Sequence, residues 1–334
     1  MAYTLAQLAK LEKKSYLKKG IIMNMLRDSK FLEWLPWQGV DSLQSYGLRV
    51  RTLGTSGAFR KINGSYTEAT DGDVEEVWES VYGFGGEVKF DRVYDKIKNV
   101  IIDPKQQQLE MKLKAMTLTF NDYVINGDHA TDADGFEGLK KRIAGMPSRQ
   151  TVALGDSAAY DPTAAAANGQ YFLTKWEEAW YKCNKGQVNA IIMNESMYYG
   201  YARVLRFLNL SGGAGLLDTT KDSHDRTIVT YRGAPFVDIG LKKDQSTEII
   251  TNTETSLAAG SDTTSVYFAS FGIENGGLGG IQLSDMEVYD PNNGAEMSTA
   301  PATQVRIEWW HGLCNLESYG LTRLYNLENP AAWT

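Results

Sequence analysis

The segment from Asp103 to Asp128, DPKQQQLEMKLKAMTLTFNDYVINGD, constrains the fold more than any other part of the sequence. Its apolar residues recur at steps of four, three, four and four, which places them on one stripe of an α-helix. These residues are Leu109, Leu113, Met116, Phe120 and Val124, whereas Lys112, Lys114 and Asn121 lie off the stripe. A helix of ~22 residues, at about 1.5 Å per residue, is a rod of roughly 33 Å, which is long for a globular domain. We therefore expect a spine helix over about 104–126.

The ends of this helix are also indicated by the sequence. Asp103 can accept hydrogen bonds from the free N–H groups of the first turn, and Pro104 suits the first helical position. Asn126-Gly127 predicts a left-handed stop.

The composition is that of an ordinary globular protein. The chain has 334 residues, 43% hydrophobic and 22% charged, enough for one elaborate domain or two. No apolar run approaches the ~18 residues of a membrane span, and Lys10, Lys13 and Lys14 interrupt the N-terminus where a secretory signal needs an apolar core. Synthesis in the cytoplasm and no membrane partner are expected. Cys183 and Cys314, without C-x-x-C spacing, predict buried free thiols.

The net charge of −7 is unevenly distributed. Residues 1–30 carry +5, which leaves −12 on the remainder. The bases that precede the first glycine are Lys10, Lys13, Lys14, Lys18 and Lys19. A basic segment on an acidic body can face a polyanion or can be the solvated side of a helix, and charge alone favours the helix.

The N-terminal half predicts a helix followed by a long hairpin. Leucine, isoleucine and methionine form an interrupted helical stripe over 4–30. Residues 46–94 alternate as strands, with a tight turn at Asn63-Gly64 and a polar tip over 54–73. Two strands alone are marginal in water, so we expect this hairpin to lie on another subunit.

The region after the spine helix predicts mixed α and β structure. We expect a loop over 145–170, an Asn194 helix cap and then mostly strands. The predicted helices are 174–183 and 195–208, and the predicted strands are 188–193, 227–231, 235–239, 265–271, 280–283, 305–310 and 319–325. The class is α+β.

A search for metal sites finds one weak candidate. The histidines, His129, His224 and His311, are scattered. Asp128, His129, Asp132 and Asp134 superficially resemble a calcium loop. The match fails because Ala130 stands at the first ligand position and Lys141 at the twelfth. We therefore predict no metal and no cofactor.

A search for catalytic motifs is equally negative. The glycine-rich runs at 83–86, 212–215 and 276–280 lack the P-loop pattern and are interpreted as turns. There is no G-x-S-x-G elbow and no Cys with a plausible His partner, so no catalytic residue is assigned. Glu308-Trp309-Trp310-His311 could form a sugar-binding platform, but a strand with Val305, Ile307 and Trp309 on one face explains it more simply. The many Tyr, Trp and Arg residues suit protein–protein contacts.

The order of these parts resembles the major capsid proteins of tailed double-stranded DNA bacteriophages, the HK97-like family. The supporting stretches are NDYVINGD and FEGLKKRI at and after the spine helix, YRGAPFVDIG at 231–240, TTSVYFASFGIENGGLGGIQL at 263–283 and VRIEWWHGLCNLESYGLTRLYNLE at 305–328. The resemblance covers nearly the whole chain.

The resemblance implies an N-arm over 1–45, an E-loop over about 46–94, a P-domain over 95–145 and 303–334, and an A-domain over 146–302. It implies hexamers and pentamers in an icosahedral shell around double-stranded DNA, with portal and scaffold or decoration proteins as further partners. Arg49, Arg51, Arg60 and Lys61 of the E-loop would contact the next subunit. The lysines 10, 13, 14, 18 and 19 would lie near the inner surface, because an otherwise acidic wall does not hold DNA too tightly.

Two family features are not predicted for this chain. The N-arm starts directly, so we expect a separate scaffold or none. Lys61 with Asn315, Asn326 or Asn329 supplies the residues of an isopeptide cross-link, but such residues occur by chance in most chains. The alternatives are an encapsulin-like compartment and, from another class, a metal-dependent or carbohydrate-active enzyme built on His129, Asp132, Asp134 or Trp309-Trp310.

Overall fold

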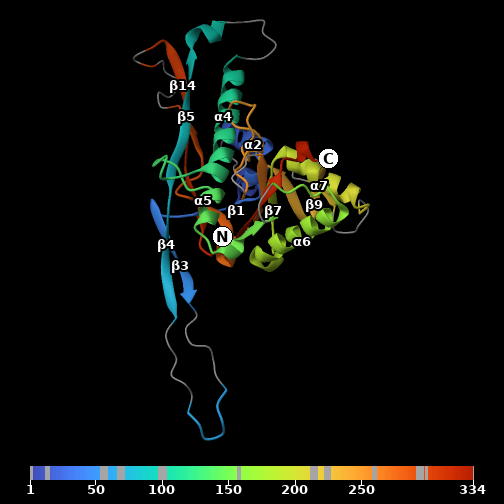
Figure 1. Ribbon diagram of the computed structural model, residues 1–334. Coiled ribbons are helices and arrows are strands. Elements are labelled where there is room, and N and C mark those ends of the chain that lie inside the picture. The colour runs from blue at the N-terminus through green and yellow to red at the C-terminus, as the bar shows by residue number, and fades with distance from the viewer. Residues whose placement is uncertain are drawn as a thin grey trace.

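The computed structural model describes residues 3–11, 16–52, 59–65, 72–96, 104–155, 159–210, 217–221, 227–257, 262–290, 297 and 300–333. It shows a body of helices and sheets from which one hairpin projects (Figure 1). The predicted α+β class is confirmed.

The spine helix is confirmed as α4, Pro104–Asn126. Leu113, Met116, Phe120 and Val124 are buried as predicted. Asn121 is also buried, which the stripe did not predict, because α4 is covered on a second side. Its amide accepts a hydrogen bond from Ser29 Oγ at 2.7 Å and donates to the Ile239 carbonyl at 3.2 Å.

The predicted left-handed stop after α4 is wrong. Gly127 does not have a positive φ. Glycine is needed at position 127 because the backbone there packs closely against other backbone. A Cβ would lie 2.4 Å from the Phe136 carbonyl oxygen and 2.6 Å from the Tyr123 carbonyl oxygen. The predicted cap Asp103 lies outside the described residues.

The structure describes two helices within the predicted helix over 4–30, and residues 12–15 between them lie outside the described residues. The two helices are α1, Leu5–Leu11, and α2, Tyr16–Asp28. A third helix, α3, Lys30–Trp34, follows with Ser29 as its N-cap. The apolar residues of these helices pack into the same core as the spine helix.

A six-stranded sheet forms one framework of the body. Its strands are β1 (Tyr3–Thr4), β2 (Pro36–Gly39), β5 (Tyr82–Asp91), β12 (Leu278–Gln282), β13 (Glu287–Tyr289) and β14 (Ala302–Asn315). Strand β14 is longer than predicted and pairs antiparallel with β5 over ten consecutive residue pairs. The run Gly83 to Gly86, interpreted as a turn, lies inside β5, and this interpretation was wrong.

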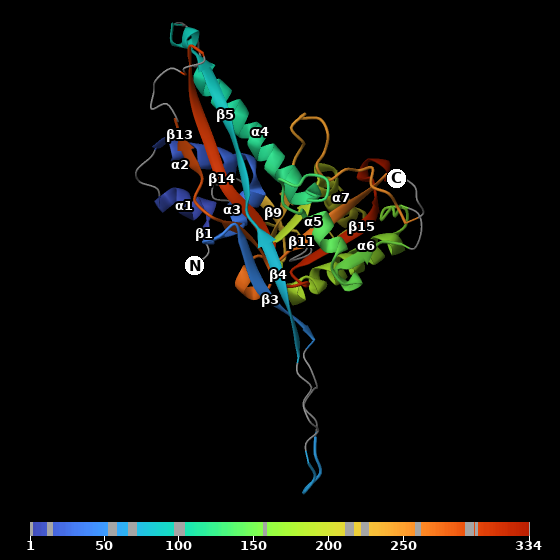
Figure 2. The same cartoon turned by 90° about the vertical axis from the view of Figure 1, so that its left-hand side faces the viewer.

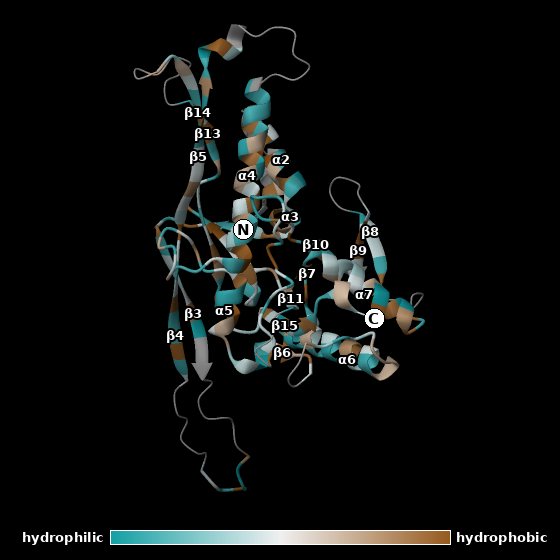
Figure 3. Cartoon of the chain, turned by 45° about the horizontal axis from the view of Figure 1, so that its top comes forward, coloured by the Kyte–Doolittle hydropathy of each residue, from teal (hydrophilic) through white to brown (hydrophobic). Residues whose placement is uncertain are grey.

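A seven-stranded sheet forms the second framework, in the order β6-β15-β11-β7-β10-β9-β8. The strands are β6 (Thr151–Ala153), β7 (Ala190–Met193), β8 (Asp218–Lys221), β9 (Thr227–Tyr231), β10 (Ala234–Asp238), β11 (Thr263–Ala269) and β15 (Leu321–Glu328). In β7 the residues Ile191 and Met193 face one core, whereas Ala190 and Ile192 face the other. Both faces are therefore covered, which explains its unbroken apolar sequence. Figure 3 shows the hydrophobic colour gathered in the body around β7 and β11.

Helices α6 (Ala166–Lys182) and α7 (Glu195–Phe207) cover one face of this sheet. The Asn194 cap is confirmed, because its side chain accepts from the Met197 N–H at 2.9 Å. Helix α6 begins eight residues before the predicted Thr174. Residues 166–170, interpreted as part of a loop, are helical, and Ala166 and Ala167 suit the first turn because alanine has the highest helix propensity. Helix α5 (Leu139–Ala144) follows the spine helix.

The sheets mix segments from both predicted domains. Strands β12 and β13, from 146–302, pair in the sheet of β14, whereas β15, from 303–334, lies in the seven-stranded sheet. The domain boundaries stay a prediction.

Candidate assembly surfaces

The projecting hairpin has two chemically different faces. Strands β3 (Gln44–Thr52) and β4 (Asp73–Ser80) pair antiparallel as a sheet of their own. On one face Tyr46, Leu48, Val74 and Trp78 are each more than half exposed, and the Tyr46 and Trp78 rings lie 4.9 Å apart. The opposite face meets the body, where Arg49 Nε donates to the Leu316 carbonyl at 2.6 Å. An apolar face is thus left uncovered within this chain.

A buried ion pair fixes the base of the hairpin. Arg142 of α5 binds both oxygens of the Glu79 carboxylate, with an Nη2 to Oε2 distance of 2.9 Å, and also donates to the Leu313 carbonyl at 3.0 Å. The side chains are 9% and 12% exposed. Burial alone would lower the pKa of Arg142, but the adjacent Glu79 carboxylate raises it, so the guanidinium stays charged.

The tip of the hairpin, residues 59–65, is exposed throughout. Phe59 and Ile62 have exposed fractions of 109% and 93%. The predicted tight turn is present: Asn63 has a φ of 66°, and the Gly64 N–H donates to the Lys61 carbonyl at 2.9 Å.

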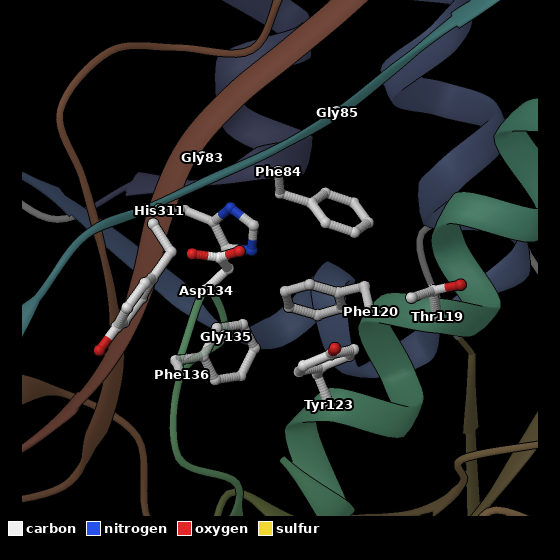
Figure 4. Close-up of a pocket in the computed structure, with 11 residues that line it drawn as sticks. Gly83, Phe84, Gly85, Thr119, Phe120, Tyr123, Asp134, Gly135, Phe136 and His311 are labelled. Atoms are coloured by element: carbon white, nitrogen blue, oxygen red, sulfur yellow. The ribbon is translucent and has the colours of Figure 1, made fainter. Parts of the chain in front are cut away.

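An aromatic cavity of about 220 Å³ lies between β5, α4 and the loop after α4. Figure 4 shows Phe84, Phe120 and Phe136 around it, with the His311 imidazole on its wall. Tyr82 and Tyr123 also line it, and Asp134 stands at its edge. The cavity is therefore apolar inside and acidic at one edge.

The acidic loop beside this cavity is held by hydrogen bonds within the chain. Asp132 accepts a hydrogen bond from Tyr123 Oη, which together with burial raises the pKa of Tyr123 to about 12. Asp128 accepts from the Ala130 N–H at 3.0 Å and pairs with Lys141 at 3.1 Å. His129 Nδ1 lies 3.2 Å from the Gly135 carbonyl oxygen. Across the described ranges no cluster of three or more His, Cys, Asp and Glu side chains could hold a metal ion.

Both cysteines are buried free thiols, as predicted. Burial raises the pKa of each, Cys183 and Cys314, to about 12, which keeps them protonated. His311 is buried, and His224 lies outside the described residues. Trp309 is buried and Trp310 is 40% exposed, which confirms the strand interpretation of 305–310.

Solved structures with similar backbones identify the fold. The encapsulin SrpI of Synechococcus elongatus PCC 7942, in its holo complex, has a TM-score of 0.60 at 12% identity, over 98% of this chain and 97% of that chain. The capsid of a native GTA particle has a TM-score of 0.55 at 13% identity, over 86% of each chain. A structure from Mycobacterium phage Bobi has a TM-score of 0.53 at 8% identity, over 96% and 97%. The chain has the HK97-like fold.

The HK97-like fold that the order of sequence elements indicates is confirmed by the similar backbones of solved structures. No family model and no curated protein matches the sequence. Among these neighbours, one is an encapsulin and one is the capsid of a GTA particle. Among the helices that the structure describes, none is both long and apolar enough to cross a membrane.

The E-loop arginines and lysine predicted to contact another subunit occupy different environments. Arg49 is bound to its own chain through Leu316. Arg51 lies in β3, and its side chain is not described. Arg60 and Lys61 are exposed at the tip, where Arg60 Nη1 donates to the Gly64 carbonyl at 3.2 Å. Their contacts with a neighbour stay a prediction.

The predicted inner-surface lysines are only partly described. Lys10 on α1 and Lys19 on α2 are exposed. Lys18 belongs to α2, without a described side chain, and Lys13 and Lys14 lie outside the described residues.

The residues that an isopeptide cross-link would use lie in different environments. Asn315 and Asn326 are 3% and 1% exposed, and Asn329 uses its side chain to accept from the Ala331 N–H. Lys61 is exposed. Cross-linking stays untested.

Sequence reasoning missed the Glu79–Arg142 pair and the His311 cavity. The partners in each are far apart in sequence, and no local pattern connects them. A signal for the tip did exist: Phe59 and Ile62 are apolar residues inside an otherwise polar stretch.

Proposed function

We propose that this chain is the major capsid protein of a tailed bacteriophage, which assembles as hexamers and pentamers into an icosahedral shell around double-stranded DNA. The observation that supports it is a shell-protein fold over nearly the full length, combined with an E-loop whose apolar face its own chain leaves uncovered.

The E-loop supplies the physical reason for assembly. Each large apolar side chain moved out of water contributes about 1.5–3 kcal/mol. Tyr46, Leu48, Val74 and Trp78 offer four such side chains on one face. A two-stranded hairpin gains little stability from itself, so its face is best covered by a neighbouring copy. Contacts of this kind, repeated around a closed shell, strengthen one another through high effective concentration.

The charge distribution supports DNA as the content. Lys10 and Lys19 are exposed on the N-arm, whereas the rest of the chain is acidic. We propose that the lysines at 10, 13, 14, 18 and 19 lie at the inner surface and offset repulsion from DNA without binding it tightly. Such a protein is made in the host cytoplasm and resides in the virion, with a portal and, where present, scaffold or decoration proteins as partners.

An encapsulin-like compartment is the second candidate. It is favoured by the SrpI match, which has the higher TM-score and the fuller coverage among the three structures described above. In that case the shell would enclose a protein cargo in place of a genome.

Electron microscopy of the purified protein and of its native particles tests both candidates. Closed shells with nuclease-protected DNA in the native source are expected. Native shells that contain protein and no protected DNA would support the compartment. Monomers or small oligomers under all assembly conditions would contradict both.

A further inference from the structure

The tip of the E-loop combines exposed apolar side chains with positive charge. Phe59 and Ile62 have no cover, and Arg60 and Lys61 between them give the described tip a charge of +2. Figures 1 and 2 both show this segment far from the body. A fully exposed phenylalanine beside two cations suits a binding site that is an apolar cavity with acidic side chains at its edge.

The aromatic cavity has the complementary chemistry. Its volume of about 220 Å³ exceeds the roughly 150 Å³ of an engineered protein cavity that holds benzene, so a phenyl ring fits. The walls formed by Phe84, Phe120 and Phe136 allow edge-to-face contacts with such a ring. Asp134 lines the cavity and is exposed, and the partly exposed Asp132 accepts a hydrogen bond from Tyr123 of the cavity wall.

The backbone packs closely around this cavity because glycine stands at three positions of its wall. Gly83, Gly85 and Gly135 all line the cavity. A Cβ on Gly135 would lie 2.4 Å from the Tyr123 ring, and a Cβ on Gly85 would lie 2.3 Å from the Ile307 carbonyl oxygen. Glycine at these positions lets the walls approach closely while the centre stays free.

We propose that Phe59 of one copy inserts into the aromatic cavity of a neighbouring copy, with Arg60 and Lys61 beside Asp132 and Asp134 of that copy. This inference rests on the proposed shell function and specifies which residues lock adjacent subunits. Phe59 is assigned as the inserted residue rather than Ile62 because the walls are aromatic rings.

Substitutions at the tip test whether Phe59 inserts into the cavity of a neighbouring copy. Phe59→Ala should raise the critical concentration for shell assembly at least about tenfold, whereas the matched Ile62→Ala should raise it less. Arg60→Glu with Lys61→Glu should weaken assembly, and adding Asp134→Lys should restore it in part. Circular dichroism of the unassembled chains, unchanged in each variant, separates assembly from folding.

An engineered disulfide tests directly whether Phe59 lies beside Asp134 of a neighbouring copy. Phe59→Cys with Asp134→Cys, mildly oxidised in assembled shells, should give covalent ladders on denaturing gels. Phe59→Cys with Tyr181→Cys is the control, because Tyr181 is 62% exposed on α6 and lies outside the cavity, and it should give none.

Failure of the inference is distinct from failure of the function. If Phe59→Ala assembles as readily as the wild type, and Phe59→Cys with Asp134→Cys gives no ladder, the docking site is overturned and the shell function is left intact. A wild-type chain that forms no shells would overturn both.

Discussion

At the scale of the residue, His311 is held neutral by its surroundings. Its ring stacks on Trp309 at 4.1 Å and 14°, and the Phe120 and Phe84 rings lie 5.3 and 5.4 Å away. No protein atom in the described part of the chain bonds to Nε2. Burial lowers the pKa of His311 to about 3, so the folded chain does not take up a proton that the unfolded chain accepts below about pH 6.5.

Acid should therefore destabilise the chain through His311. Its contribution to stability is complete above about pH 6.5 and is lost as the pH falls toward 3, at about 1.4 kcal/mol per pH unit. Between about pH 6.5 and 5 the free energy of unfolding should drop by about 2 kcal/mol from this residue. Urea denaturation of the unassembled chain measures it, with His311→Phe as the control. Equal losses in both proteins would show that His311 is not responsible.

Two glycines that follow helices give a matched comparison. Gly127→Ala should destabilise the chain by about 1–3 kcal/mol, because the new Cβ meets two backbone carbonyl oxygens that cannot move independently. Gly145→Ala should change stability by less than about 0.5 kcal/mol, since its nearest atom is the Arg142 carbonyl oxygen at 3.5 Å. Thermal unfolding of both variants checks this, and similar shifts would contradict the close-packing explanation.

At the scale of the element, the projecting hairpin is attached to the body at its base by the Arg142 side chain. Arg142 bridges β4 and the end of β14 through Glu79 and Leu313. A buried pair adds little net stability compared with apolar residues, but removing one partner leaves an uncompensated charge. The pair thus connects β4 of the hairpin to α5 and β14.

Breaking this pair should be costly. Glu79→Ala should lower the free energy of unfolding by about 3–5 kcal/mol, whereas Glu79→Ala with Arg142→Met should cost less than the two single changes together. The control is Arg306→Ala, which removes a pair with Glu87 in which both side chains are about a third exposed, and it should leave the free energy of unfolding nearly unchanged. Denaturant unfolding of all four variants measures these effects, and additive costs would contradict the coupling.

At the scale of the whole molecule, folding and assembly use different surfaces. The two cores fill the body, one under the N-arm and spine helix and the other under α6 and α7. Among the residues whose burial is described, neither core contains one from β3 or β4. The hairpin can therefore be shortened without removing core side chains.

Replacing residues 52–72 by Asn-Gly should prevent shell assembly while leaving the stability of the monomer nearly unchanged. The free energy of unfolding of the monomer should stay within about 1 kcal/mol of the wild type, because the described part of the deleted segment, residues 59–65 and 72, is exposed. Shell assembly should be abolished. Calorimetry and light scattering measure the two effects, and shells of normal yield from the shortened chain would show that the E-loop tip is dispensable.

The sequence predicts elements better than their partners. The stripe from Leu113 to Val124 and the Asn194 cap depend on neighbours within a few positions, so both were predictable. The burial of Asn121 was not, because it depends on Ser29 and Ile239, each about a hundred residues away. Glycine was the least predictable residue: Gly85 lies in a strand, and Gly127 ends a helix without a left-handed conformation.

Of the candidate surfaces, the one formed by neighbouring residues was predictable from the sequence, and the one formed by distant residues was not. The exposed tip is contained in one short stretch, and its apolar residues are visible in the sequence. The cavity joins β5, α4 and β14, whose pairing only the fold reveals.

The long pairing of β14 with β5 has a mechanical consequence. Tension along the strand axis loads all ten residue pairs at once, as in shear, whereas a pull at one end would open them in turn. Each backbone hydrogen bond contributes only about 0.5–1.5 kcal/mol, so their resistance depends on sharing the load. A shell whose contents press outward would be strongest where stress runs parallel to these strands.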